Sequence, residues 1–223
     1  MKVGALVSGA KDSMYAAYAA SKKHELVCLI TLVPEKPDSW MFHVPNLHLV
    51  PKQAELTGLP LVSIPTPGEK EEELIDLKAA IKLAKDKYKI EGIVSGAIAS
   101  EYQKSRIEKI CKELKLESIA PIWHMNEEQY MQRLILDGFE VIIAGVAAEG
   151  FDESWLGRKI DRNTIADLKK LNIHLAGEGG EYETFVLDCP LFKKKIKVVS
   201  AEKRMESEYA GVYEIKEIKL VKK

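Results

Sequence analysis

The residues best suited to chemistry lie in a short stretch near the N terminus, between an apolar run and an amphipathic one. The stretch reads Ser-Gly-Ala-Lys-Asp-Ser over residues 8–13. Small residues at its centre leave backbone N–H groups open to phosphate oxygens, the lysine supplies a positive charge, and the serines donate hydrogen bonds. A helix starting here would add the partial positive charge of its N terminus. The candidate phosphate-binding residues are Ser8, Gly9, Ala10, Lys11, Asp12 and Ser13.

This stretch matches neither of two well-known phosphate-binding motifs. It lacks the GxxxxGK[ST] pattern of P-loop proteins and the GxGxxG pattern of dinucleotide-binding folds, which disfavours a kinase or a dehydrogenase. The alternative is an ordinary strand-to-helix turn in which Asp12 or Ser13 caps the helix. Spacing alone does not decide between the two interpretations.

A second unusual stretch, residues 177–184, reads Gly-Glu-Gly-Gly-Glu-Tyr-Glu-Thr. Its three glutamates would repel one another unless a cation or hydrogen-bond donors compensate their charge. A cationic ligand would be attracted by the carboxylates and, through a cation–π contact, by the tyrosine. The alternative is a glycine-rich turn with solvated acids.

The pattern of the first two thirds of the chain predicts how the first stretch is positioned. Short apolar runs alternate with amphipathic stretches, which is typical of βα units on a parallel sheet. In such a sheet, ligands bind beyond the carboxyl ends of the strands, where the turn after the first strand lies. The predicted strands are 3–7, 26–33, 61–64, 92–95 and 140–147, and the predicted helices are 46–58, 69–87, 101–114 and 126–136.

The pattern changes after Gly150. A helix near 162–171 precedes two alternating runs, KKIKVVSAE and VYEIKEIKLV, that are typical of antiparallel strands. The sequence therefore predicts an α/β fold, with a five-stranded parallel sheet flanked by helices and a small C-terminal α+β domain. We assign residues 1–150 to a nucleotide-binding domain and residues 151–223 to a smaller substrate-binding domain.

Composition limits the classes of partner. Lysine and arginine total 33 against 34 acidic residues, so no long-range field attracts a polyanion, and we expect no direct nucleic-acid binding. Cys28, Cys111 and Cys189 are far apart and form no CxxC pair, which argues against a disulfide framework and a zinc site. No membrane span or targeting segment is visible, so we expect a cytoplasmic protein. A homo-oligomer is left open.

Several motifs together resemble a known family. SGAKDS after an N-terminal strand resembles the SGGxDS loop of the N-type ATP pyrophosphatases. MFHVPN, SGAIASEYQKSRIEKIC, PIW and GEGGEYETFVLDCPLF resemble the signature set of the diphthine–ammonia ligase family, in the same order and over most of the chain. The resemblance implies a fold of the adenine nucleotide alpha hydrolase-like, HUP type.

The resemblance also implies a reaction, the last step of diphthamide synthesis. The diphthine carboxylate on elongation factor 2 would be amidated with ammonium through an acyl adenylate, and AMP and pyrophosphate would be released. ATP and Mg²⁺ would be the cofactors. Two alternatives stay open: an ATP pyrophosphatase that modifies tRNA, and a non-catalytic module that binds adenine nucleotides.

The same resemblance assigns roles to residues. Nucleotide binding is expected at residues 8–13, at His43, where a purine could stack, and in a second loop at Gly96, Ser100 and Gln103. Asp12 is a candidate Mg²⁺ ligand as well as a candidate helix cap. The candidate catalytic residues are Lys11, Asp12, Glu181 and Glu183, and the candidate substrate-binding residues are Trp155, Glu178, Gly179, Gly180, Glu181, Tyr182 and Glu183.

One position departs from the family pattern, because Ala10 stands where the family loop usually has glycine. If this position needed a positive φ, alanine would cost about 1 kcal/mol of strain, and its methyl group could crowd the phosphates. We therefore expect weakened nucleotide binding at worst.

Overall fold

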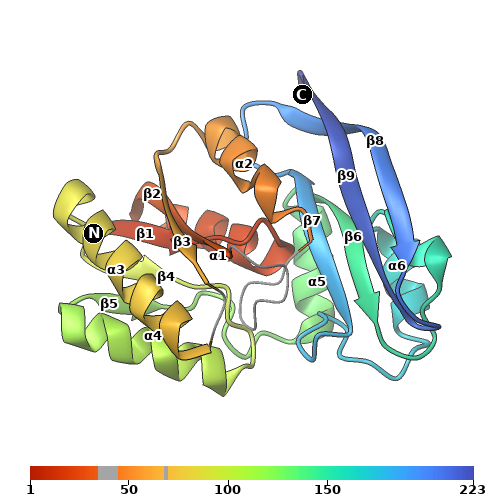
Figure 1. Cartoon of the computed structure of the whole chain (residues 1–223), viewed down its shortest axis with the longest axis horizontal. Coiled ribbons are helices and arrows are strands. Elements are labelled where there is room, and N and C mark those ends of the chain that lie inside the picture. The colour runs from red at the N-terminus through yellow and green to blue at the C-terminus, as the bar shows by residue number, and fades with distance from the viewer. Residues whose placement is uncertain (35–44, 68–69) are drawn as a thin grey trace. The chain divides into compact units, whose positions relative to one another are not determined.

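The computed structural model describes residues 1–34, 45–67 and 70–223, which divide into two compact units, Met1–Trp123 and His124–Lys223 (Figure 1). The sequence analysis placed the division after residue 150. The structure divides earlier because the helix and the strand between residues 126 and 147 belong to the second unit. The assignment of nucleotide to the first part and substrate to the second stays a prediction.

The first unit contains the predicted parallel sheet of five strands. The strands are β1 (Lys2–Leu6), β2 (Glu25–Pro34), β3 (Leu61–Thr66), β4 (Gly92–Val94) and β5 (Glu117–Ile119). Their order is β3-β2-β1-β4-β5, and every neighbouring pair is parallel. The predicted α/β fold is thus confirmed, but the fifth strand is residues 117–119 and not residues 140–147.

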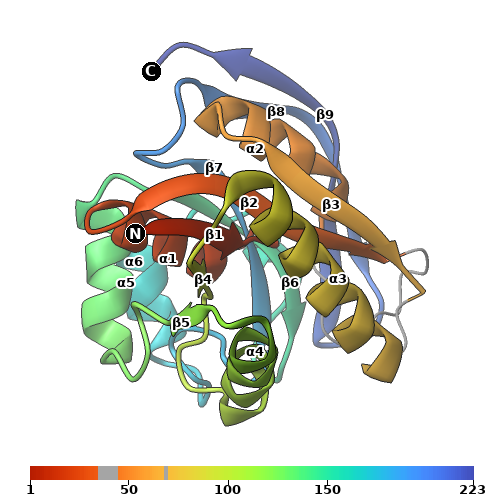
Figure 2. The same cartoon turned by 90° about the vertical axis from the view of Figure 1, so that its left-hand side faces the viewer.

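Helices follow the strands at the spacing that the apolar residues predict. They are α1 (Lys11–Ser21), the short η1 (Leu47–Leu49), α2 (Val50–Thr57), α3 (Lys70–Tyr88) and α4 (Glu101–Leu114). Leu77 and Ile81 of α3 and Ile110 of α4 pack with Ile30 of β2 in one buried apolar cluster. α3 and α4 therefore cover the same face of the sheet, and α1 lies on the other face (Figure 2).

The strand order creates a switch point in the sheet. The chain runs from β1 outward through β2 to β3 and then crosses to β4 on the other side of β1. The connections after β1 and β4 therefore leave their strands in opposite directions. A crevice opens at such a point in open parallel sheets, and ligands bind there.

The second unit is built on an antiparallel sheet of four strands in the order β7-β6-β9-β8. The strands are β6 (Glu140–Ala147), β7 (Tyr182–Asp188), β8 (Lys195–Met205) and β9 (Ala210–Val221), and the helices are α5 (Glu127–Leu136), η2 (Glu153–Trp155) and α6 (Arg162–Leu168). The two alternating runs near the C terminus form the predicted antiparallel pair.

The placement of residues 140–147 in the parallel sheet was wrong. Their apolar run, EVIIAGVA, resembles a buried parallel strand, but β6 pairs antiparallel with β7 and β9. An apolar run of eight residues reports burial on both faces and not the direction of its neighbours. Among the described residues, no helix is long and apolar enough to cross a membrane.

Candidate functional site

The loop after β1 turns at Gly9. Gly9 has a φ of 86°, in the left-handed region that favours glycine, whereas Ala10 has a φ of −78° and a ψ of 163°. Ala10 thus occupies extended backbone that any residue adopts, so the strain considered for this position does not arise. The position that requires glycine is Gly9.

The start of α1 leaves backbone donors available for a ligand. The helix begins at Lys11 after Ala10, whose side chain provides no cap. The prediction that Asp12 or Ser13 caps this helix was therefore wrong, because both lie inside its first turn. Within residues 1–34, 45–67 and 70–223, the N–H groups of Gly9 and Ala10 form no hydrogen bond. An uncapped helix start with open N–H groups binds anions through its donors and its dipole.

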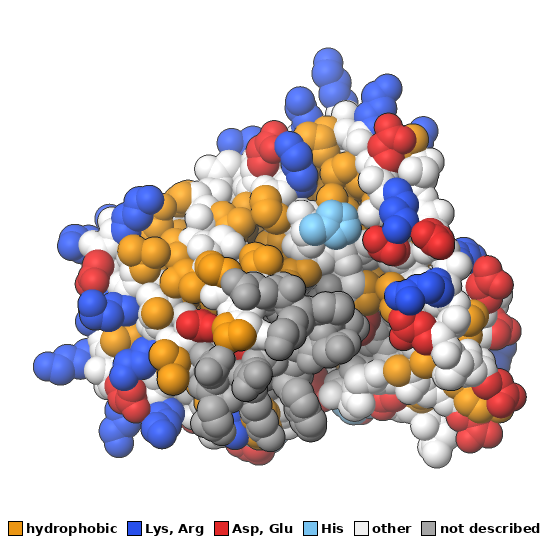
Figure 3. All heavy atoms as spheres, viewed as in Figure 1, with side chains coloured by type: hydrophobic (Ala, Val, Ile, Leu, Met, Phe, Trp, Pro, Cys, Tyr) orange, Lys and Arg blue, Asp and Glu red, His pale blue; other side chains and the backbone are white. Residues whose placement is uncertain are grey.

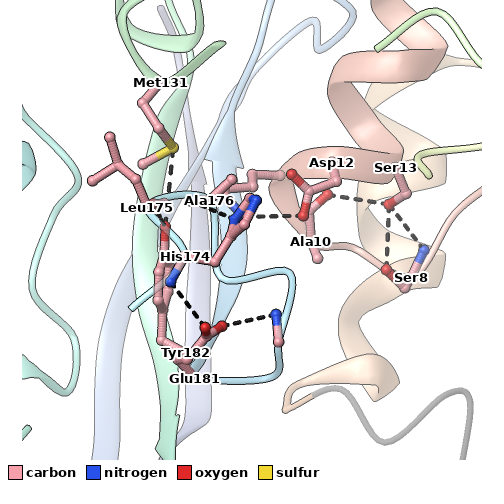
Figure 4. A network of polar contacts seen from close by, with 12 residues as sticks. Ser8, Ala10, Asp12, Ser13, Met131, His174, Leu175, Ala176, Glu181 and Tyr182 are labelled. Atoms are coloured by element: carbon pink, nitrogen blue, oxygen red, sulfur yellow. Dashed lines mark hydrogen bonds and ion pairs between the residues drawn. The ribbon is translucent and has the colours of Figure 1, made fainter. Parts of the chain in front are cut away.

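Two serines hold the loop in this shape (Figure 4). Ser13 Oγ accepts a hydrogen bond from the backbone N–H of Ser8 at 3.2 Å and lies 3.3 Å from Ser8 Oγ. The same hydroxyl donates to the carbonyl of Ala10 at 3.1 Å. The serines therefore close the turn on itself as well as offering hydroxyl groups to a ligand.

Lys11 is buried at the mouth of this loop. Its side chain is 2% exposed, and its Nζ lies 2.9 Å from Oδ2 of Asp12, whose side chain is 27% exposed. Burial of an ammonium group is costly unless an anion accompanies it, and Asp12 supplies one. The start of α1 thus carries a buried cation paired with a carboxylate that is partly accessible.

Gln53 of α2, which is not among the residues predicted from sequence, supports the loop. Gln53 is 1% exposed, and its Nε2 donates to the carbonyl of Gly9 at 3.2 Å. This bond connects two segments 44 residues apart in the sequence. A sign was present, because Gln53 occupies a buried position of a helix whose other buried residues, Val50, Ala54 and Leu56, are apolar.

Gly96, in the connection after β4, lies directly against the start of α1. A Cβ at this position would be 2.6 Å from the backbone nitrogen of Ser13 and 2.7 Å from the carbonyl carbon of Asp12. Only glycine lets the connections after β1 and β4 approach this closely. Gly96 thus has a structural role as a close backbone contact, and its role toward a nucleotide stays a prediction.

The other two predicted residues of the second loop have different environments. Ser100 caps α4 by accepting a hydrogen bond from the backbone N–H of Gln103 at 3.3 Å, and the side chain of Gln103 is exposed. Their roles toward a nucleotide stay predictions. The predicted His43 lies outside the described residues.

Several polar side chains of the first unit are buried. They are Lys11, Thr31, Asn46, Gln53, Thr66, Glu73 and Ser95. Burying polar groups costs free energy unless they are paired, and the bond from Gln53 to the Gly9 carbonyl is one such pairing at the candidate site.

In the second unit, the loop before β7 is held by carboxylates (Figure 4). Glu181 accepts hydrogen bonds from the backbone N–H groups of His174 at 2.9 Å and Gly179 at 2.8 Å. Glu127 of α5 accepts from the N–H of Leu175 at 2.6 Å, and its other oxygen lies 3.2 Å from His174 Nε2. Glu181 is thus engaged by its own loop, and Glu127 and His174 are supporting residues that the sequence analysis missed.

Two predicted substrate-binding aromatic residues are buried in the second unit. Tyr182 is 2% exposed, and its hydroxyl donates to the carbonyl of Leu175 at 2.7 Å. Trp155 is 7% exposed and packs edge-on against Phe151. The Tyr182 ring is covered by the core in this conformation, and its predicted contact with a cationic substrate stays a prediction. Both rings support the loop and the sheet.

The remaining predicted residues of this turn are more accessible. Glu178 and Glu183 are half-buried, and Gly179 and Gly180 are exposed. Gly180 has a φ of 81°, and a Cβ on Gly179 would lie 2.7 Å from Oε1 of Glu181. The two glycines thus allow the turn to fold around the Glu181 carboxylate. The predicted roles of Glu178 and Glu183 stay predictions.

The cysteines are unsuited to chemistry. Burial raises the pKa of the Cys28 and Cys189 thiols to about 12 and that of Cys111 to about 11. A thiol with so high a pKa carries almost no thiolate at neutral pH. Among the described residues, no three His, Cys, Asp or Glu side chains are grouped to hold a metal ion.

Comparison with known proteins gives consistent matches. Residues 1–118 match the family described as diphthamide synthase N-terminal domain, and residues 126–221 match diphthamide synthase C-terminal domain. Proteins named diphthine–ammonia ligase from Bos taurus and Homo sapiens are 40% and 39% identical to this chain, covering 91% of it and 84% of each relative. The Mus musculus protein of that name is 39% identical, over 93% of this chain and 86% of its own length.

One solved structure is also similar, although weakly. It is described as a predicted subunit of tRNA methyltransferase from Methanocaldococcus jannaschii and covers 85% of this chain and 98% of its own. It is 17% identical with a TM-score of 0.44, a level of similarity that assigns no function.

Proposed function

The chain belongs to the diphthamide synthase family, whose curated members are named diphthine–ammonia ligase, and from this membership we propose that it is an AMP-forming ligase acting on elongation factor 2. A ligase of that name works in diphthamide synthesis and joins ammonia to diphthine. The proposed finer steps are adenylation of the diphthine carboxylate and its amidation by ammonium. The observation that carries the proposal is the open, uncapped start of α1 at the switch point of the parallel sheet.

Adenylation places negative charge on the leaving group. A carboxylate oxygen of diphthine attacks the α-phosphorus of ATP, the bond to the β-phosphate oxygen breaks, and pyrophosphate leaves. The N–H groups of Gly9 and Ala10, the start of α1 and Lys11 are suited to stabilise that charge, because they are fixed before the reaction begins. The hydrogen bond from Gln53 to the Gly9 carbonyl helps to hold this turn in place.

Amidation needs neutral ammonia. Ammonium loses a proton, the nitrogen attacks the acyl carbon, and the bond from that carbon to the AMP oxygen breaks, which gives the amide, AMP and a further proton. A glutamate in or just before β7 is the proposed proton acceptor, and Glu181 and Glu183 are the candidates. Glu178 and Glu183 would also attract the trimethylammonium group of diphthine.

Mg²⁺ fits this loop if phosphates and water provide most of its ligands, as is usual for that ion. Asp12 is the carboxylate at the start of α1, and it is partly accessible beside Lys11. We propose Asp12 as the protein ligand. The ion would neutralise charge on the phosphates during adenylation.

The alternative of an ATP pyrophosphatase that modifies tRNA, for example by thiolation, receives no support from the cysteines. Enzymes of that type generally use reactive cysteines, whereas Cys28, Cys111 and Cys189 are all buried with raised pKa values. The alternative of a non-catalytic nucleotide-binding module rested on Ala10, whose extended backbone removes the expected obstacle.

The test is a reconstituted reaction with purified protein, ATP, Mg²⁺, ammonium and elongation factor 2 carrying diphthine. We expect AMP and pyrophosphate in equal amounts with the amide, measured by chromatography and by the mass of the modified peptide. Omitting ammonium or the factor should abolish sustained AMP formation. Equal AMP formation without the factor, or ATP binding without turnover, would refute the proposal.

A further inference from the structure

The β8–β9 hairpin has an unusual distribution of charge. We define its lysine end as residues 193–198 and 218–223, which contain no acidic residue and seven lysines: Lys193, Lys194, Lys195, Lys197, Lys219, Lys222 and Lys223. The rest of the hairpin, residues 199–217, has five glutamates and three basic residues. Lys and Arg side chains accordingly gather around the end of β9 (Figure 3).

Six of the seven lysines are exposed, and five of these six form no ion pair with any described residue: Lys193, Lys194, Lys197, Lys219 and Lys222. The other two have a structural role, because Lys195 and Lys223 lie 3.4 Å and 2.8 Å from the carboxylate of the buried Asp188. In the remainder of the hairpin, by contrast, Lys216 pairs with Glu214 at 2.7 Å and with Glu202 at 3.3 Å.

The strand register places two of these charges opposite each other. Lys197 of β8 pairs directly with Lys219 of β9. Like charges at directly opposed positions destabilise a hairpin, and a glutamate at either position would remove the repulsion. Lysines on exposed edges do protect sheets from aggregation. Protection from aggregation does not explain why acidic residues are absent from the lysine end, since the other half of the hairpin carries both acidic and basic residues.

Backbone pairing also distinguishes the lysine end from the rest of the second sheet. β9 pairs with β6 only through residues 210–212, whereas it pairs with β8 from residue 211 to residue 221. Residues 195–198 and 218–221 therefore form a two-stranded ribbon, and Lys195 and Lys223 connect it to the carboxylate of Asp188. The register places it at the opposite end of the sheet from the loop before β7, because Tyr182 pairs with Val146 and that residue pairs with Gly211.

We propose that the lysine end is a docking surface for an acidic face of the protein substrate, and this inference rests on the proposed function. A cluster of five uncompensated cations attracts an anionic surface and accelerates its association. The ribbon offers neither arginine for bidentate phosphate contacts nor aromatic rings for base stacking, so its chemistry fits carboxylates of a protein better than RNA. Its distance from the substrate loop suits a second contact with a large partner.

The test uses the variant Lys194→Glu/Lys219→Glu. Its matched control is Lys23→Glu/Lys112→Glu, which reverses two exposed charges of the first unit that likewise form no ion pair with a described residue. Amide formation is measured with diphthine-bearing elongation factor 2 at 50 and 300 mM salt. We expect the hairpin variant to raise KM for the factor about tenfold at low salt and less at high salt, with kcat and KM for ATP unchanged.

Thermal unfolding separates docking from stability. Lys219→Glu creates an opposite-charge pair with Lys197, so the hairpin variant should melt no lower than the wild type. If the hairpin variant had the same KM for the factor and the same salt dependence as the control, the proposed docking surface would be wrong. It would also be wrong if the variant lost affinity for a tRNA-sized RNA while its KM for the factor did not change. Wild-type protein that forms no amide at all would instead refute the proposed function.

Discussion

Replacing Gly96 by alanine is expected to disturb the phosphate loop through a single methyl group. The new Cβ would lie 2.6 Å from Ser13 N, whereas ordinary contacts begin at 3.4 Å, so the two backbones must separate by about 0.8 Å. Overpacking of this kind costs about 1–3 kcal/mol. In a chain of this length, each kcal/mol lowers the melting temperature by about 2–4 °C.

The displaced atoms belong to the start of α1, so nucleotide binding should suffer more than folding. A misplacement of this size at a reacting centre costs about 100-fold in rate. We expect kcat/KM for ATP to fall by about that factor and calorimetric ATP affinity to fall with it. The control is Gly138→Ala, which has no neighbour within 4 Å of a new Cβ and a φ of 82°. It should cost about 1–3 kcal/mol through its backbone and leave ATP affinity intact.

Two results would contradict this reasoning. If Gly96→Ala bound ATP with wild-type affinity while its melting temperature fell, the two loops would touch at a place unimportant for the nucleotide. If it changed neither quantity, the close approach of Gly96 to the start of α1 would itself be wrong.

Three further predictions concern single residues outside the phosphate loop. Gln53→Leu should raise KM for ATP more than it lowers kcat, and it should lower the free energy of unfolding in denaturant by about 1–3 kcal/mol, because the buried Gly9 carbonyl loses its hydrogen-bond donor. An unchanged KM would show that Gln53 does not position the loop. Glu127→Gln should raise KM for the protein substrate and leave KM for ATP unchanged, since it weakens the anchor of the loop before β7; equal effects on both would contradict the separation of roles. Asp161→Ala should cost about 0.5–2 kcal/mol by removing the cap of α6. The hydrogen bond from the Thr164 N–H lowers the pKa of the Asp161 carboxyl in the folded protein. The stabilisation is therefore full above the unfolded-state pKa and is lost as pH falls through the lower folded-state pKa. If wild type and variant still differed in stability below both pKa values, as measured by unfolding titrations, the assignment would be contradicted.

The individual elements of the first unit were predictable from local patterns. α4 spans residues 101–114 as expected, and α3 begins and ends within one residue of its predicted bounds. The apolar periodicity of a helix and its cap residues are neighbours in sequence, so they can be recognised without knowledge of the fold. β5 was missed because three residues, of which only Ile119 is strongly apolar, carry too little pattern.

The tertiary structure decided which strands pair with each other and which polar groups form hydrogen bonds. β6 has the composition of a parallel strand and pairs antiparallel, because strand direction depends on which distant segments bury its faces. The same holds for polar groups. The sequence does not show which groups bind the Glu181 carboxylate, whereas the folded loop brings the N–H groups of His174 and Gly179 onto it.

By itself, the sequence determined the chemistry available to this protein: a small-residue loop with one lysine after the first strand, and an acidic glycine-rich turn far along the chain. These depend on residue type and local spacing alone. Only the tertiary structure decided that Gln53 supports Gly9 and that Gly96 lies against Ser13. Such contacts join residues more than forty positions apart, and their distances are set by the packing of helices and loops around the sheet, which no local pattern specifies.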